Sequence, residues 1–335
     1  MSFANHAPVM EEEAVAALAP QNKGVYADAT FGGGGYARAL LGSANCSVYG
    51  FDRDPTAIAR AAKWASAYGP RLTLINRPFD EMGEGLADCG VDGIDGAVFD
   101  LGVSSMQLDE AARGFSFRFD GPLSMRMDCG KPDAADVVNK GEAGDLAAIF
   151  KAYGEERHSG RIARAIVKAR EAAPIETTGR LAEIVAKAAP AKPQDKIHPA
   201  TRVFQALRIF VNDELGQLAR ALVVAERLLR PAGRLVVVTF HSLEDRIVKR
   251  FLTDRTGATA SPSRHAPPAA EKTATFRLLF PKAAALGETE INANPRARSA
   301  KLRAAIRLDA PARADMTGFA PAPLILSNAL SDWRV

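Results

Sequence analysis

The sequence predicts an α/β fold built on a mostly parallel sheet of seven strands, with a helical domain inserted after the fourth strand. Two observations predict this arrangement. Short apolar runs alternate with helix-forming stretches over residues 24–102, a pattern typical of parallel strands joined by helices. The alternation stops after Asp100 and resumes with an almost continuous β-branched run at residues 234–240, which indicates a buried central strand.

The first part of the chain contains four of the predicted strands. A short amphipathic helix precedes the first strand, and Pro55 directly after Asp54 is typical of a helix start. The predicted strands cover residues 24–29, 47–52, 72–76 and 96–102, and the predicted helices cover residues 10–19, 36–42 and 55–67.

The second part begins with the inserted domain, in which residues 133–190 are predicted to be helical. Apolar residues then repeat with helical spacing from Thr201 to Leu229, which predicts one long core helix. Ser242 and Asp245 match a capping pattern for the next helix, and residues 254–270 have the composition of a loop. The last strands are expected at 276–280 and 301–308, and the domains at 1–107 (core), 108–200 (helical insertion) and 201–335 (core).

Composition excludes several classes of protein. The chain has 335 residues, 47% of them hydrophobic, and a mean hydropathy of −0.08, values typical of a globular protein. No apolar run approaches the roughly 20 residues that span a membrane, and residues 1–13 lack the basic start of a signal peptide. The three cysteines form no C-x-x-C motif, so we expect a cytoplasmic protein without a zinc ribbon or disulfide framework.

Four consecutive glycines, Gly32–Gly35, lie between the first strand and the helix that follows it. Such a loop lets a ligand approach the backbone and the helix N-terminus, so it predicts a nucleotide-type cofactor site. Gly32, Gly34 and Ala37 fit the dinucleotide pattern G-x-G-x-x-A, but the carboxylate of Asp28 would repel a pyrophosphate. A cationic ligand without phosphate, such as S-adenosylmethionine, fits better. The alternative is a glycine-rich turn with no ligand.

Three predicted strands end in an acid, namely Asp28, Asp52 and Asp100. Because ligands of open α/β sheets bind beyond the carboxyl ends of the strands, these acids predict a pocket suited to a cationic cofactor. Asp52 is placed to accept hydrogen bonds from ribose hydroxyls, or it is an ordinary turn residue. Phe79, beyond the third strand, either stacks on an adenine ring or packs under the next helix.

Positive charge is concentrated in residues 151–170 and 296–307, whose combined surplus exceeds the +4 of the whole chain. This pattern predicts a polyanionic partner. Arg157, Arg161, Arg164 and Lys168 are spaced to share one helix face, which either contacts phosphates or is simply solvated.

The stretch from Arg113 to Phe119 interleaves arginines with three phenylalanines. Such a segment either stacks on unpaired bases and binds phosphates, or it is a structured loop whose aromatic rings are buried in a hydrophobic core.

Taken together, these motifs resemble the bacterial small-subunit (16S) ribosomal RNA cytosine-N4 methyltransferase family (RsmH, also called MraW). The resemblance implies a class I S-adenosylmethionine-dependent methyltransferase fold, Rossmann-like, with the inserted helical domain recognising the substrate. The matching stretches follow the family's order along the chain, at residues 6–10, 28–36, 51–55, 100–109, 113–117, 121–128, 153–157, 198–202, 240–246 and 294–299.

The resemblance also implies a function and a set of site residues. The reaction would be methylation of the N4 amine of a cytidine in the decoding centre, with ribosomal RNA or a ribosomal particle as partner, without a metal or a membrane. The oligomeric state, monomer or dimer, stays open. The family usually has His at the position of Tyr36 and Pro at that of Met106. The implied cofactor contacts are Gly34, Gly35, Tyr36, Asp52, Phe79, Asp100 and Gln107.

The predicted chemistry depends mostly on orienting the cytosine amine in line with the activated methyl group. Asp100 is the candidate catalytic residue, because a carboxylate could accept the amine proton, although the resemblance assigns it to the cofactor. Carbon-5 methylation would need an activated cysteine, and nothing near Cys129 activates it. Two other classes compete: an NAD(P)-dependent oxidoreductase, disfavoured by Asp28 and Asp100, and a non-catalytic RNA-binding module.

Overall fold

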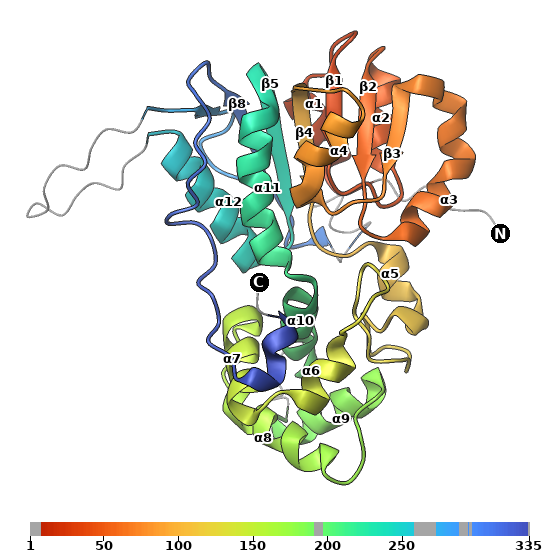
Figure 1. Ribbon diagram of the computed structural model, residues 1–335, viewed down its shortest axis with the longest axis vertical. Coiled ribbons are helices and arrows are strands. Elements are labelled where there is room, and N and C mark those ends of the chain that lie inside the picture. Colours follow the sequence, from red (N-terminus) through yellow and green to blue (C-terminus); the bar gives the residue numbers. More distant parts are fainter. Residues whose placement is uncertain (1–7, 191–196, 258–272, 288–293, 295–296, 334–335) are drawn as a thin grey trace, which may run out of the picture. The chain divides into compact units, whose positions relative to one another are not determined.

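The structure is a computed structural model that describes residues 8–190, 197–257, 273–287, 294 and 297–333 (Figure 1). Contacts between Cα atoms divide the chain into two compact units, each of which combines two separate segments. The sheet unit comprises Met1–Gly102 and Leu215–Pro321, and the helical unit comprises Val103–Glu214 and Ala322–Val335.

The sheet unit contains one mixed sheet with the strand order β3-β2-β1-β4-β5-β8-β6 (Figure 1). Neighbouring strands from β3 to β5 are parallel, and β8 runs antiparallel to both β5 and β6. The predicted fold class, a Rossmann-like and mostly parallel α/β sheet with a helical insertion, is confirmed. The strands are β1 (Val25–Asp28), β2 (Ser47–Phe51), β3 (Leu72–Ile75), β4 (Ile94–Asp100), β5 (Leu229–Thr239), β6 (Phe276–Leu278) and β8 (Lys301–Arg307).

One further strand was not predicted. Ala284 and Ala285 form β7, which pairs with β8, so the described part of the sheet has eight strands rather than seven. Two residues are too few to show the alternation by which a strand is recognised in a sequence.

Helices of the sheet unit bury the apolar faces of the strands. Leu18 and Leu40, from α1 and α2, share one buried cluster with Val48, Val98 and Val236 of the central strands. Because these strands are covered, they have the near-continuous apolar composition of a parallel sheet. The helices are α1 (Glu11–Leu18), α2 (Gly35–Ser43), α3 (Pro55–Ala65), α4 (Met82–Asp88), α11 (Glu214–Leu228) and α12 (Ser242–Arg255).

The helical unit has its own buried core, which includes Phe150, Ile162, Leu181 and Leu207. The C-terminal segment belongs to this unit: Leu330 is buried in the core, and Ser327 donates hydrogen bonds to Asp145 from its backbone N–H (2.8 Å) and its hydroxyl (2.6 Å). The helices are α5 (Ser105–Asp109), α6 (Ala134–Lys140), α7 (Ala143–Gly154), α8 (Ser159–Arg170), α9 (Thr178–Ala188) and α10 (Ala200–Asn212).

The division into units differs from the predicted domains at 1–107, 108–200 and 201–335. The predicted single helix from Thr201 to Leu229 is broken at Asp213, which has a left-handed φ of 47° and separates α10 from α11. The apolar spacing continues across the break, and therefore the sequence pattern does not reveal it. Segment 322–335 carries no periodic pattern that would assign it to the helical unit.

Two smaller predictions also differ from the structure. The N-cap of α12 is His241, which accepts the Glu244 N–H, rather than the predicted Ser242. The predicted loop at 254–270 begins as the last turn of α12, and residues 258–270 lie outside the described residues. Among the described helices, none has the length and apolar composition needed to span a membrane.

Candidate cofactor site

The structure brings the three strand-end acids to one edge of the sheet. Asp28 is the last residue of β1, Asp100 is the last residue of β4, and Asp52 follows β2 directly. The strands β2, β1 and β4 are adjacent and parallel, so their carboxyl ends meet at this edge. The three predicted acids are therefore clustered in the structure, and their role as a site for a cationic ligand stays a prediction.

Burial and mutual repulsion dominate the electrostatics of this cluster. Desolvation raises the pKa of Asp28 from an ordinary 3.8 to about 7. Hydrogen bonds from the Thr30 and Ala37 backbone N–H groups lower this pKa, and repulsion from Asp52 raises it further. Desolvation also raises the pKa of Asp100 well above its ordinary value, and repulsion from Asp28 and Glu244 adds to this. A cation bound here would favour the ionised forms of these carboxyls.

Two buried carboxylate oxygens in the cluster have no hydrogen-bond partner among the described residues. They are Oδ2 of Asp28 and Oδ1 of Asp100. Buried polar atoms usually have a hydrogen-bond partner in a folded protein. Two unpaired oxygens at the ends of the neighbouring strands β1 and β4 therefore indicate a place where a ligand would supply the missing partner.

Asp52 fixes the glycine loop to the end of β2. Its Oδ2 accepts the Gly32 N–H and its Oδ1 accepts the Asp54 N–H, each at 2.8 Å. The turn interpretation of Asp52 therefore holds, but it does not exclude a ligand, since each oxygen of a carboxylate can accept a second hydrogen bond. Desolvation is the main cause that raises the pKa of Asp52 to about 6.

Two glycines of the loop, Gly34 and Gly35, are required by packing within the protein. A Cβ on Gly34, whose φ is +76°, would lie 2.4 Å from the Trp64 ring, and a Cβ on Gly35 would lie 2.6 Å from Pro8. Trp64 also stacks on Phe31, with ring centroids 5.8 Å apart. The predicted reason for the glycines was ligand approach. The contact with Trp64 was not predicted, because nothing local in the sequence connects residue 64 with the loop.

The remaining predicted contacts have roles within the protein. Tyr36 lies in the first turn of α2, its side chain is buried, and its hydroxyl donates to the Val9 carbonyl. Phe79 is half-buried and meets Phe99 edge to face, with centroids 5.9 Å apart. Gln107 belongs to the helical unit, where it closes a capping box with Ser104 at the start of α5.

The cationic stripe of the helical unit is shorter than predicted. Helix α8 begins at Ser159, so Arg157 precedes it and lies off the helix. Arg161, Arg164 and Lys168 lie on α8 and are exposed, and no acid of the described chain forms an ion pair with them. These three residues remain available for an anionic partner.

Part of the second basic segment is engaged in contacts within the sheet unit. Lys301 and Arg303 both pair with Asp245, at 3.0 Å and 2.8 Å. Arg307 is buried and donates to the backbone carbonyls of Glu226 and Thr275. Asp245 offsets part of the positive charge of this segment, and Arg298 is exposed, so most of the charge surplus is retained. Arg296 lies outside the described residues.

The loop from Arg113 to Phe119 is partly buried and partly exposed. Phe115 is buried, Phe117 packs on the rings of His198 and Phe204 at 4.8 Å, and Arg113 donates to two backbone carbonyls. Phe119, in contrast, is 60% exposed. The core interpretation therefore holds for the first two aromatic rings and not for the third.

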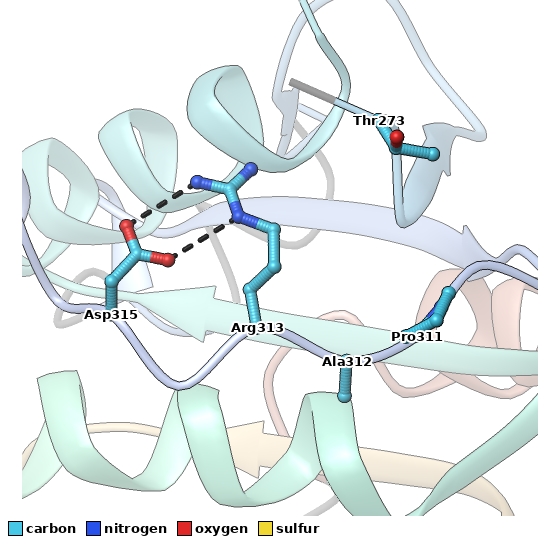
Figure 2. Close-up of a pocket in the computed structure, with 5 residues that line it drawn as sticks. All are labelled: Thr273, Pro311, Ala312, Arg313 and Asp315. Atoms are coloured by element: carbon cyan, nitrogen blue, oxygen red, sulfur yellow. Dashed lines mark hydrogen bonds and ion pairs between the residues drawn. The ribbon is translucent and has the colours of Figure 1, made fainter.

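A separate hollow of about 400 Å³ lies on the segment that follows β8 (Figure 2). Its charged side chains, Arg313 and Asp315, form an ion pair with each other at 3.3 Å, so their opposite charges offset each other. None of the strand-end acids lines it. The lining residues are Thr273, Pro311, Ala312, Arg313 and Asp315.

Comparison with known proteins shows the family of the chain. The model of the MraW methylase family matches residues 3–308. A protein of Maricaulis maris called ribosomal RNA small subunit methyltransferase H is 55% identical over 317 residues, 94% of this chain and 95% of that protein. One of the same name from Mesorhizobium japonicum is 57% identical over 309 residues, covering 92% and 89% of the two chains. The chain therefore belongs to the MraW methylase family.

Proposed function

We propose that this chain is an S-adenosylmethionine-dependent methyltransferase that modifies the N4 amine of a cytidine in the decoding centre of small-subunit (16S) ribosomal RNA, in the cytoplasm. The observation that carries the proposal is the cluster of Asp28, Asp52 and Asp100 with its two unpaired buried oxygens. S-adenosylmethionine carries an ammonium and a sulfonium and no phosphate, so it matches an acidic site. The relatives named above support the choice of ribosomal RNA.

We assign the cofactor contacts as follows. Gly34, Gly35 and Tyr36 would line the cofactor with their backbone at the start of α2, where the positive end of the helix lies. The Gly34 N–H itself donates to the Phe31 carbonyl at 2.6 Å, so Gly34 would contribute close backbone approach rather than a donor. Asp52 would accept the ribose hydroxyls with its remaining lone pairs, and Phe79 would offer its half-exposed ring to the adenine. Asp100 completes the proposed set within the sheet unit, and the contact implied for Gln107, in the helical unit, stays a prediction.

The cofactor supplies a methyl group on a cationic sulfur, and the protein has to orient the acceptor and remove a proton. Asp100 is our proposed base: Oδ1 would accept a hydrogen bond from the cytosine amine and take its proton as the methyl group is transferred. Burial raises the pKa of Asp100, which makes its carboxylate a stronger proton acceptor than an exposed one.

The direct test is to incubate the purified protein with methyl-labelled S-adenosylmethionine and small-subunit RNA or particles. We expect N4-methylcytidine in the nuclease digest, identified by mass spectrometry. Label at carbon 5, or binding of NAD(P) in place of S-adenosylmethionine, would refute the proposal.

Reversing the charge of Arg161 and Arg164 together to Glu is expected to weaken RNA binding and to lower its salt dependence. Each lost phosphate contact lowers the slope of log K against log salt by about 0.7–0.9, so the double variant should lose about 1.4–1.8. Filter binding at several salt concentrations measures both quantities. S-adenosylmethionine affinity should stay unchanged, because the cofactor acids belong to the sheet unit.

The matched control reverses Arg60 and Lys63 of α3, which are also exposed and also three residues apart. Both double variants change the net charge equally. If the two variants weaken RNA binding to the same degree, the effect of α8 is only one of overall charge, and the assignment of a phosphate contact to α8 is wrong.

A further inference from the structure

Thr30 lies in the turn between β1 and the glycine loop and connects two of the strand-end acids. Its hydroxyl oxygen accepts the backbone N–H of Asp100 at 2.6 Å. Its own backbone N–H donates to Oδ1 of Asp28 at 3.4 Å. One residue therefore bonds to both of the strand-end acids that carry an unpaired buried oxygen.

The Thr30 hydroxyl continues the sheet where the β1 backbone turns away. The paired register of β1 and β4 ends at Asp28 and Val98, and the Ala29 N–H still reaches the Val98 carbonyl at 2.9 Å. Beyond this point β4 continues to Asp100, while the segment that follows β1 enters the glycine loop. A side-chain oxygen thus accepts the Asp100 N–H in place of a backbone carbonyl, which keeps a backbone donor from being left unpaired.

The opposite side of the β4 end is held by ordinary backbone pairing. The Leu101 N–H donates to the Val238 carbonyl of β5 at 3.0 Å. The end of β4 is consequently fixed by β5 on one side and by a single hydroxyl on the other. The position of the Asp100 carboxylate relative to Asp28 depends on that hydroxyl.

We propose that Thr30 is a positioning residue of the cofactor site, which holds the end of β4 so that the Asp100 and Asp28 carboxylates bind the cationic ligand together. The identity of the ligand rests on the proposed function. A bound cation is stabilised by two carboxylates only where both lie at a suitable distance, so a small displacement of one weakens binding.

Thr30→Val keeps the branched shape of the side chain and removes the oxygen. A methyl group cannot lie 2.6 Å from a backbone nitrogen, so the end of β4 has to move. We expect S-adenosylmethionine affinity, measured by calorimetric titration, to fall about tenfold or more. Thr30→Ser keeps the oxygen, and its affinity for S-adenosylmethionine should stay within about threefold of that of the original protein.

A double-mutant cycle with Asp100→Asn separates positioning from general support of the fold. If Thr30 acts through Asp100, Thr30→Val should reduce affinity by less than about threefold once Asp100 is Asn. A valine that lowers affinity by the same factor in both backgrounds would overturn the proposal. Should Thr30→Val fail to fold, Thr30→Ala serves in the same cycle.

Thr178 provides the matched control. It is a buried threonine of the helical unit whose hydroxyl oxygen likewise accepts a backbone N–H, from Gly121 at 3.2 Å. Thr178→Val should lower the melting temperature without changing S-adenosylmethionine affinity. Unchanged affinity in Thr30→Val refutes the positioning role alone, whereas an original protein that binds no S-adenosylmethionine refutes the proposed function itself.

Discussion

Asp28→Asn is expected to make the ligand-free protein more stable at pH 8 and, at the same time, to weaken S-adenosylmethionine binding. Asp28 is fully buried, and its pKa rises from 3.8 to about 7 on folding. A shift of this size corresponds to about 4 kcal/mol of unfavourable free energy when the carboxyl is forced to ionise, by the conversion of 1.36 kcal/mol per unit. Asparagine removes that penalty and keeps an oxygen for the Thr30 N–H.

The sign of the pH dependence follows from the raised pKa. The contribution of Asp28 to folding is most favourable below its unfolded pKa near 3.8 and is lost as the pH rises through about 7. The stability gained by Asp28→Asn should therefore grow between pH 4 and pH 7 and level off above. Urea unfolding at several pH values measures it, and a gain that does not depend on pH would contradict the explanation.

The pH dependence of ligand affinity should have the opposite sign to that of the Asp28 contribution to folding. The ionised carboxylate attracts a cation, so S-adenosylmethionine affinity of the original protein should rise as the pH increases through about 7, and Asp28→Asn should lose about tenfold or more at pH 8. The exposed Asp309→Asn is the control for a change of one charge and should alter neither quantity. Asp52 and Asp100, also at this edge, have raised pKa values and will broaden the transition.

Gly34→Ala is expected to abolish measurable S-adenosylmethionine binding and to destabilise the protein by about 2–5 kcal/mol. The added Cβ would lie 2.4 Å from the Trp64 ring and 2.6 Å from Phe31, in a residue whose φ is +76°. Both the overpacking and the left-handed backbone oppose the substitution. Thermal unfolding and calorimetric titration measure the two effects.

Gly42→Ala, eight residues further along in α2, is the matched control. A Cβ there meets no atom within 4 Å, so alanine should stabilise the helix by about 0.5–1 kcal/mol and leave binding unchanged. If Gly34→Ala behaves like Gly42→Ala, the close packing of Trp64 on the loop is not what requires a glycine.

Much of the sheet unit could be predicted because its signals are local. The apolar runs that end at Asp28 and Asp100, and the glycines after β1, place strands, turn and helix within a few residues of their observed bounds. The boundary between the units could not be predicted in this way. Both α10 and α11 have an apolar face, and a break of one residue at Asp213 does not interrupt the apolar spacing.

By itself, the sequence determined the fold class, the acids at the strand ends and the family, since these follow from periodicity, turn residues and motifs along the chain. Only the tertiary structure decided which of those residues have partners. Lys301 and Arg303 pair with Asp245, Trp64 packs against Gly34, and the Thr30 hydroxyl holds the end of β4. Each of these contacts joins residues at least 30 positions apart, and their proximity is created by packing of the sheet and its helices rather than by any local pattern.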